Sequence, residues 1–451
     1  MDSNTIKRAL AKAKGEFSSV LLEEKRKRII SFNARGLERV SLREFTSGHI
    51  RVFHKGNWGF ATFNTVDAFE NYARCAFEGA KLLPAQRKKL ALPEPVSCRV
   101  SPKIDDPPFN HSIEEIESIL KCYRDILKGH SLVQEVFCSY SEAVVNRHFV
   151  SNLGSDIEEQ RVYVQLVFGV VARDGTNIQR ASWSFGGQEN FTEILNREDK
   201  AEEVVKDAVD LLKAEKVQAG VYTVIVDPKL GGVFIHEAFG HLSEADHFLQ
   251  LEKLQDVMKI GRRLGTDLLS VVDDPGIPGA FGSYAYDDEG VKGRKTYIIK
   301  DGILTGRLHS METAGILGEE LTGNARSMSG DSVPIVRMSS TYIEPRESIF
   351  EEMLEGIENG IYAVGAYGGN TELEMFTFSS QKAYKIQNGK IGPMLRDVVL
   401  SGNVFETMMN IEMIGNDLRL TPGHCGKSGQ TVPVCTGSPH LRIKNVVIGG
   451  K

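Results

Sequence analysis

The stretch that decides the fold is residues 221–241, VYTVIVDPKLGGVFIHEAFGH. Its first six residues are β-branched or aromatic, so they predict a buried strand. Pro228 and Gly231-Gly232 follow, and the sequence predicts a helix that begins near Val233. The residue composition changes here, because short predicted strands and glycines dominate the sequence downstream. We therefore expect a domain boundary near residues 215–222.

Upstream of this strand, the sequence predicts helices packed on antiparallel strands. Residues 49–54 and 58–63 flank a turn, as is typical of a β-hairpin. Alternation predicts further strands at 17–22, 37–45 and within 131–187, and apolar spacing predicts helices at 6–14, 66–83, 112–127 and 201–214. Six prolines between residues 84 and 108 indicate an extended connector without a core element.

Composition excludes several classes of protein. The 451 residues carry a net charge of −6 and 41% hydrophobic residues, which is typical of a globular chain with a sizeable core. The apolar runs are far shorter than the ~20 residues of a membrane span, and no signal-peptide pattern follows Met1. The six cysteines form no dense framework, which favours reduced thiols and a cytoplasmic location. We expect neither membrane nor direct nucleic-acid binding, and interpret the basic run Lys25–Arg28 as a solvated face.

The segment His236-Glu237-Ala238-Phe239-Gly240-His241 carries the candidate chemistry. Two neutral imidazoles can bind Zn²⁺, and a neighbouring glutamate can take a proton from water held by the metal. The usual His-Glu-x-x-His spacing places the two rings ~40° apart around a helix, whereas the spacing here places them ~140° apart. A shared ion therefore requires a distorted helix, either through a π-bulge or because the helix ends at Gly240.

A metal site of this kind needs a third protein ligand, and the residues leave several candidates open. Glu244, Asp246 and His247 follow the motif closely. Cys425 is a distant candidate in a glycine-rich run, and its thiolate could approach an ion. The adjacent His424 would point the other way in an extended segment. The competing interpretation is a buried structural histidine beside a solvated pair.

These residues resemble the TldD/PmbA family of zinc metalloproteases, in particular its TldD branch. The resemblance rests on His236-Glu237-x-x-x-His241 and on a second run that contains Cys425, Gly426-Lys427, Gly429-Gln430 and Val432-Pro433-Val434. Weaker matches extend from Trp58-Gly59-Phe60-Ala61 to Gly415–Leu418, so the resemblance covers most of the chain. The PmbA (TldE) branch lacks the metal motif, so its presence here favours the catalytic branch.

The resemblance implies a zinc ion held by His236, His241 and Cys425, with Glu237 as general base and then general acid. It also implies an α+β fold of two domains: an N-terminal α/β domain, residues 1–218, and a β-rich C-terminal domain, residues 219–451, that carries the metal. Family members form homodimers or heterodimers with a metal-free paralogue. The dimer encloses the active site, which favours unfolded peptides over folded proteins.

The sequence therefore predicts a zinc metallopeptidase that hydrolyses peptide bonds in unfolded peptides or small unstructured proteins. The alternative is a non-catalytic peptide-binding or regulatory subunit with a structural zinc. Glu237 discriminates between them, because a structural site needs no general base. A peptide substrate could bind by adding a strand to a sheet edge of the β-rich domain.

Four further expectations concern side chains around this candidate site. Glu244 and Asp246 are expected to orient the histidines. Cys435 is interpreted as a passive buried thiol. Gly368-Gly369-Asn370 is predicted to be a turn, and Phe376-Thr377-Phe378 a strand with one face in the core.

Overall fold

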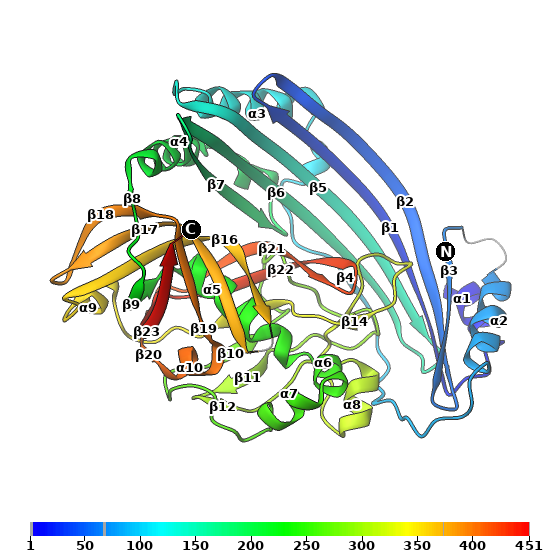
Figure 1. Cartoon of the computed structure of the whole chain (residues 1–451). Coiled ribbons are helices and arrows are strands. Elements are labelled where there is room, and N and C mark those ends of the chain that lie inside the picture. Colours follow the sequence, from blue (N-terminus) through cyan, green and yellow to red (C-terminus); the bar gives the residue numbers. More distant parts are fainter. Residues whose placement is uncertain (1–2, 66–68, 373, 451) are drawn as a thin grey trace.

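The computed structural model describes residues 3–65, 69–372 and 374–450. Within these ranges, the first part of the chain forms one seven-stranded sheet in the order β3-β2-β1-β5-β6-β4, with β7 beside β6. Four strands are unusually long: β1 (Phe17–Asn33), β2 (Gly36–His54), β5 (Val133–Ser151) and β6 (Asp156–Asp174). Figure 1 shows them arching over the rest of the molecule.

The hairpin and most helices of this part agree with the sequence predictions. β3 (Asn57–Phe63) pairs with β2 so that Trp58 lies opposite Phe53. The helices are α1 (Ser3–Leu10), α2 (Phe69–Ala80), α3 (Ile113–Leu127) and α4 (Glu198–Lys213). The Ser112 side chain caps α3 by accepting a hydrogen bond from the Glu115 backbone N–H at 3.1 Å. Residues 66–68 of the predicted second helix lie outside the described residues.

Two predictions for this part were wrong in extent. The strands predicted at 17–22 and 37–45 are β1 and β2, which run much further because β1 pairs with β2 on one side and β5 on the other. These pairings keep the charged residues of β1 in strand conformation, although apolar and polar residues alternate only weakly in this part of the sequence. The proline-rich connector also contributes a short edge strand, β4 (Ser97–Val100), parallel to β6. β7 (Asn177–Gly187) completes the sheet.

The second part of the described chain builds two larger sheets and a two-stranded one. The eight-stranded sheet contains β8 (Glu215–Lys216), β9 (Gly220–Val226), β16 (Asn359–Glu372), β17 (Met375–Gln387), β18 (Lys390–Arg396), β19 (Val398–Asn403), β20 (Ile411–Ile414) and β23 (Leu441–Gly450). Its order is β16-β9-β23-β19-β17-β18-β8, and an additional β16–β17 pairing closes five of these strands into a ring. The predicted strand at 221–226 is thus the central strand β9.

The six-stranded sheet has the order β12-β11-β10-β15-β22-β21, so that β21 is an edge strand. Its members are β10 (Val271–Asp273), β11 (Thr296–Lys300), β12 (Ile303–Leu304), β15 (Ser340–Ile343), β21 (Arg419–Lys427) and β22 (Gln430–Ser438). β13 (Ala325–Arg326) pairs with β14 (Ile335–Val336), and short helices follow the loops: α6 (Ala245–Gln250), α7 (Glu252–Val257), α8 (Met311–Leu317), α9 (Phe350–Leu354) and α10 (Val404–Met409).

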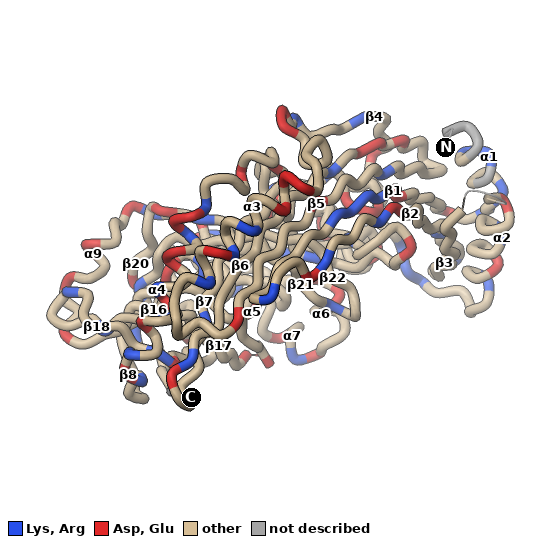
Figure 2. Tube along the Cα trace, turned by 90° about the horizontal axis from the view of Figure 1, so that it is seen from above, with Lys and Arg blue, Asp and Glu red and all other residues tan. Residues whose placement is uncertain are grey.

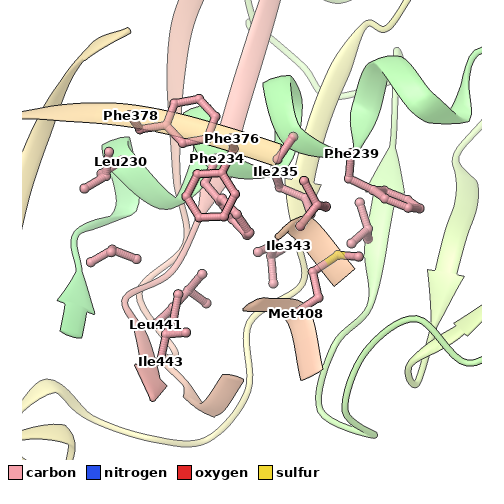
Figure 3. Close-up of a cluster of buried hydrophobic side chains, with 14 of the residues drawn as sticks. Leu230, Phe234, Ile235, Phe239, Ile343, Phe376, Phe378, Met408, Leu441 and Ile443 are labelled. Carbon is pink, nitrogen blue, oxygen red and sulfur yellow. The ribbon is translucent and has the colours of Figure 1, made fainter. Parts of the chain in front are cut away.

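Helix α5 (Pro228–Ala238) packs against both large sheets of this part and fills the core between them. Figure 3 shows Leu230, Phe234 and Ile235 of this helix among Phe376 and Phe378 of β17. The helix lies so close to β22 that a Cβ on Gly232 would stand 2.8 Å from the Gly437 backbone nitrogen. The absence of a side chain at Gly232 is therefore required by close packing. Among the described residues, none of the helices has the length and apolar character of a membrane span.

Two surface predictions are corrected by this fold. Gly368-Gly369-Asn370 is not a turn but part of β16, because these residues pair with β17 and a bulge between Ala366 and Gly368 absorbs the irregularity. The basic run of β1, visible as a blue stretch in Figure 2, is only partly solvated. Arg28 is buried and paired with Glu142 at 2.5 Å, because alternate residues of β1 face the packed side of the sheet. Phe376 and Phe378 are buried as predicted.

Candidate metal centre

The helix that carries the motif begins earlier than predicted and ends where the spacing requires. Asp227 caps α5 by accepting a hydrogen bond from the Leu230 N–H at 2.8 Å, and Pro228 occupies the first turn. The predicted start near Val233 was therefore wrong. The helix ends at Ala238, and a 3₁₀ turn, Gly240–Ser243, takes over. Of the two distortions that allow a shared ion, the structure contains the helix end, because regular α-helix stops before His241.

The three residues that the resemblance nominated as ligands lie together. The candidate ligand atoms of His236, His241 and Cys425 lie within 4.8 Å of one another. Cys425 Sγ is 3.2 Å from Nε2 of His241, and the two imidazole rings stand 5.4 Å apart at an interplanar angle of 78°. Cys425 is buried on β21, whereas His424 is exposed, as the alternation of a strand predicts.

The other candidate ligands lie outside this triad. Glu244 is fully buried, and its Oε2 lies 2.9 Å from Nδ1 of His241. His247 contacts the backbone oxygen of His241 through its Nδ1 at 3.1 Å. Asp246 has no contact with the ligand atoms and instead pairs with Lys427 at 2.7 Å. Glu244 is thus placed to fix the ring of His241 from behind, which leaves Nε2 facing Cys425.

The electrostatics of this cluster favour a positive charge. Burial opposes it, but the hydrogen bonds from His241 to Cys425 and Glu244 raise the pKa of His241 to about 10. Burial also raises the pKa of the Cys425 thiol, yet its hydrogen bonds to His236 and His241 outweigh this and lower the pKa to about 5. The pocket therefore favours a protonated His241 between the Cys425 thiolate and the Glu244 carboxylate, although burial disfavours charge. Such a pocket is suited to a metal cation.

Two features of the residues fit a divalent metal ion in particular. Nδ1 of His236 is buried and has no hydrogen-bond partner, which is costly for a polar atom unless another group binds the ring. Two imidazoles and one thiolate are donors that zinc accepts, and three protein ligands leave a coordination position open. Glu237, next to His236, is half-buried and makes no hydrogen bond or ion pair with the described residues.

Sequence reasoning assigned no role to Lys427, although this residue belongs to the matched run. Its ammonium is 3.0 Å from Glu244 and 2.7 Å from Asp246, and its side chain is only 6% exposed. The spacing in the sequence could have indicated this role, because Lys427 lies two residues after Cys425 and therefore on the same face of the strand. Cys435, in contrast, lies in a separate apolar cluster with Phe281, and burial raises the pKa of its thiol.

Comparison with known proteins yields matches along most of the chain. Three family models match: PmbA/TldA metallopeptidase domain 1 over residues 19–81, its central domain over 102–214 and its C-terminal domain over 219–450. A metalloprotease of Synechocystis sp. is 38% identical over 97% of this chain and 96% of its own length. A zinc metalloprotease TldD homolog of Saccharolobus solfataricus is 31% identical over 89% of each chain. The crystal structure of TldE from Thermococcus kodakarensis shares the fold, with a TM-score of 0.81, 18% identity and coverage of 99% of this chain and 100% of its own.

Proposed function

This chain belongs to the PmbA/TldA metallopeptidase family, and from this premise we propose that it is a zinc metallopeptidase acting on unfolded peptides or small unstructured proteins. The observation that carries the proposal is the convergence of His236, His241 and Cys425 within 4.8 Å, with Glu237 next to His236 in the sequence and without a hydrogen bond or ion pair to the described residues. A structural metal site has no need for such a carboxylate. The proposed division of the chain is an N-terminal domain, 1–218, and a metal-bearing domain, 219–451.

Each residue of the centre has a proposed role. His236, His241 and Cys425 would hold the zinc ion. When bound, zinc supplies Lewis acidity, which lowers the pKa of a water molecule and polarises the carbonyl of the scissile peptide bond. Glu237 accepts the proton of the attacking water and then donates it to the leaving amine. Glu244 keeps the Nδ1 side of His241 occupied, so that Nε2 stays directed at the metal position.

The position of Cys425 supports an extended substrate. Its strand, β21, pairs with β22 on one side and is the edge strand of the six-stranded sheet. The backbone groups of an edge strand can pair with an added strand, which a flexible peptide can supply and a folded protein cannot. The proposed substrate therefore binds along β21, with its scissile bond near the metal ligands.

Assembly and location are proposed on separate grounds. The family resemblance implies a dimer, either with a second copy or with a metal-free paralogue, and the fold that this chain shares with TldE is consistent with a related partner. All six cysteines are free, and this supports a reducing, cytoplasmic location.

The test compares the purified protein with its Glu237→Gln variant, which keeps the size of the side chain and removes the base. Metal content is measured by elemental analysis, and cleavage of an unstructured peptide mixture by mass spectrometry. We expect one zinc per chain in both proteins and cleavage only by the wild type, with a rate loss of about 10²–10⁴-fold in the variant.

Two outcomes would contradict parts of the proposal. If both proteins bind zinc and neither cleaves peptides, even with a metal-free paralogue added, the zinc is structural and the chain is a peptide-binding subunit. If Glu237→Gln cleaves as fast as the wild type, Glu237 is not the base. A folded protein of similar composition serves as the control substrate and is expected to remain intact.

A further inference from the structure

A single buried lysine joins the two segments that carry the metal ligands. Lys427 belongs to β21, the strand of Cys425, whereas Glu244 and Asp246 follow His241. The Lys427 ammonium is 3.0 Å from Glu244 Oε2 and lies 2.7 and 2.8 Å from the two carboxylate oxygens of Asp246. It also donates a hydrogen bond to the backbone oxygen of Val336 at 2.9 Å. These contacts span 181 residues of sequence separation or more between the strand and the motif segment.

The geometry of these contacts connects the lysine to one ligand directly. Glu244 uses the same oxygen, Oε2, toward Lys427 and toward Nδ1 of His241. The chain of contacts therefore runs from the strand of Cys425 through Lys427 and Glu244 to the ring of His241. An ammonium group offers three donors in a tetrahedral arrangement, which suits acceptors that converge from two carboxylates and a backbone carbonyl.

We propose that Lys427 is a positioning residue of the metal centre: by clamping Glu244 and Asp246 onto β21, it sets the separation and orientation of His241 relative to Cys425. This inference rests on the proposed function, because it assumes that these two residues bind one ion. Lys427 touches neither substrate nor metal ligand atoms and acts only through its partners. Without it, the fully buried carboxylate of Glu244 and the partly buried carboxylate of Asp246 would lie together without the ammonium that pairs with both.

The test uses Lys427→Met, which keeps the length of the side chain and removes its charge. Zinc affinity is measured by competition with a chelator of known affinity, and the geometry by the visible spectrum of the cobalt-substituted protein. Partners that orient metal ligands typically contribute 10–100-fold to affinity, so we expect zinc binding to weaken by roughly that factor. The thiolate-to-cobalt charge-transfer band should shift or lose intensity, because the bond between Cys425 and the metal is altered.

Lys382→Met is the matched control. Lys382 is also a partly buried lysine, 15% exposed, and both carboxylate oxygens of Asp207 lie 2.7 Å from its ammonium. The Lys382→Met substitution also removes one positive charge, but from β17 instead of β21. We expect this variant to lose stability without any change in zinc affinity or in the cobalt spectrum.

Asp246→Asn provides a second route if Lys427→Met does not fold. It weakens the clamp from the opposite side, so on its own it should also weaken zinc binding and alter the cobalt spectrum, because both variants act through one contact. Unchanged zinc affinity and an unchanged cobalt spectrum in a folded Lys427→Met or Asp246→Asn protein would overturn the proposal. Failure of the proposed function is distinct: wild-type protein that binds zinc elsewhere, with affinity unaffected by Cys425→Ser, would refute the centre itself.

Discussion

Two of the regions where buried ionisable groups gather are the metal centre and a seam between the seven-stranded sheet and the loop that follows β10. In the seam, which we define by Arg51, Arg147, Arg161, Glu159, Asp288 and Glu289, each arginine meets a carboxylate: Arg147 pairs with Asp288 at 2.6 Å, Arg161 with Glu159 at 2.5 Å and Arg51 with Glu289 at 2.7 Å. In the centre, Nδ1 of His236 has no partner and Glu237 pairs with none of the described residues.

The comparison distinguishes charged groups that stabilise the fold by pairing with one another from polar groups that remain available to bind a metal ion or a substrate. Burial is costly for any charge, and in the seam opposite charges compensate for it. Asp288 illustrates this, because burial raises its pKa, yet the charges of Arg147 and Arg161 outweigh burial and lower it. In the centre, Lys427 and His241 compensate for Glu244, but Nδ1 of His236 and the carboxylate of Glu237 have no partner among the described residues. Changes in the centre should therefore affect metal binding, and changes in the seam should affect stability.

The largest expected effect is that of Cys425→Ser, which removes the thiolate from the centre. We expect zinc to be lost and peptide cleavage to fall by more than about 100-fold, because loss of a ligand should exceed the effect of losing its supporting partner. Elemental analysis and a peptide cleavage assay measure both effects. Cys435→Ser, on the adjacent strand β22, should retain wild-type zinc content and activity. Equal behaviour of the two variants would remove Cys425 from the centre.

The next effect concerns the seam. Arg147→Met removes the cation that pairs directly with the buried carboxylates of Asp288 and Glu23, so we expect a loss of about 3–5 kcal/mol in the free energy of unfolding. Denaturation by urea measures this loss. Zinc content per folded molecule should not change, and a variant that loses zinc while still folded would contradict the distinction between the two regions.

Arg99→Met is the control for the seam. Arg99 pairs with Glu158 at 3.1 Å, but its side chain is 82% exposed. The cost should therefore stay within about 1 kcal/mol, because solvent screens an exposed pair.

A smaller effect depends on pH. His49 is fully buried, and its Nδ1 lies 2.7 Å from the backbone oxygen of Gly330. Burial and the nearby charge of Arg51 lower the pKa of His49 to about 3, so the folded protein keeps it neutral. Below pH 6.5 the unfolded chain binds a proton that the folded chain rejects, so stability falls as the pH falls.

We expect a loss of about 2 kcal/mol between pH 6.5 and pH 5 that His49→Gln does not show, on the basis of 1.36 kcal/mol per pKa unit. Urea denaturation of both proteins at the two pH values measures it. Parallel pH profiles for wild type and variant would show that His49 is not the group responsible.

The smallest effect is expected at the helix that carries His236. Asp227→Ala removes the hydrogen bonds that Leu230 and Gly365 donate to this carboxylate and should cost about 1 kcal/mol. Asn403→Ala removes the corresponding cap of α10 and should cost a similar amount. Thermal unfolding compares the two. Zinc affinity should stay unchanged in both, and a weakening in Asp227→Ala alone would extend the metal centre to the start of α5.

The sequence predicted individual elements better than their extents. Strand β9 and the helix capped by Ser112 follow from local patterns, because burial periodicity and capping act over a few residues. The full length of β1 and the strand character of Gly368 were missed, because pairing with distant strands overrides weak local preference. The start of α5 was missed because Pro228 and Gly231-Gly232 were placed before the helix, whereas proline suits its first turn and the glycines lie within it.

By itself, the sequence determined the chemical types of the centre and the need for a distorted or interrupted helix between its two histidines. Both follow from local rules, because donor chemistry belongs to each residue and angular spacing belongs to the helix. Local rules left the third ligand open and the family resemblance nominated Cys425, but only the tertiary structure decided how this distant residue faces the two histidines. It places Cys425 3.2 Å from His241 across 184 positions of sequence, and it assigns Glu244 and Lys427 to the support of that contact. Periodicity predicts which face of the strand Cys425 occupies. The distance between Cys425 and His241, in contrast, depends on how β21 packs against the end of α5.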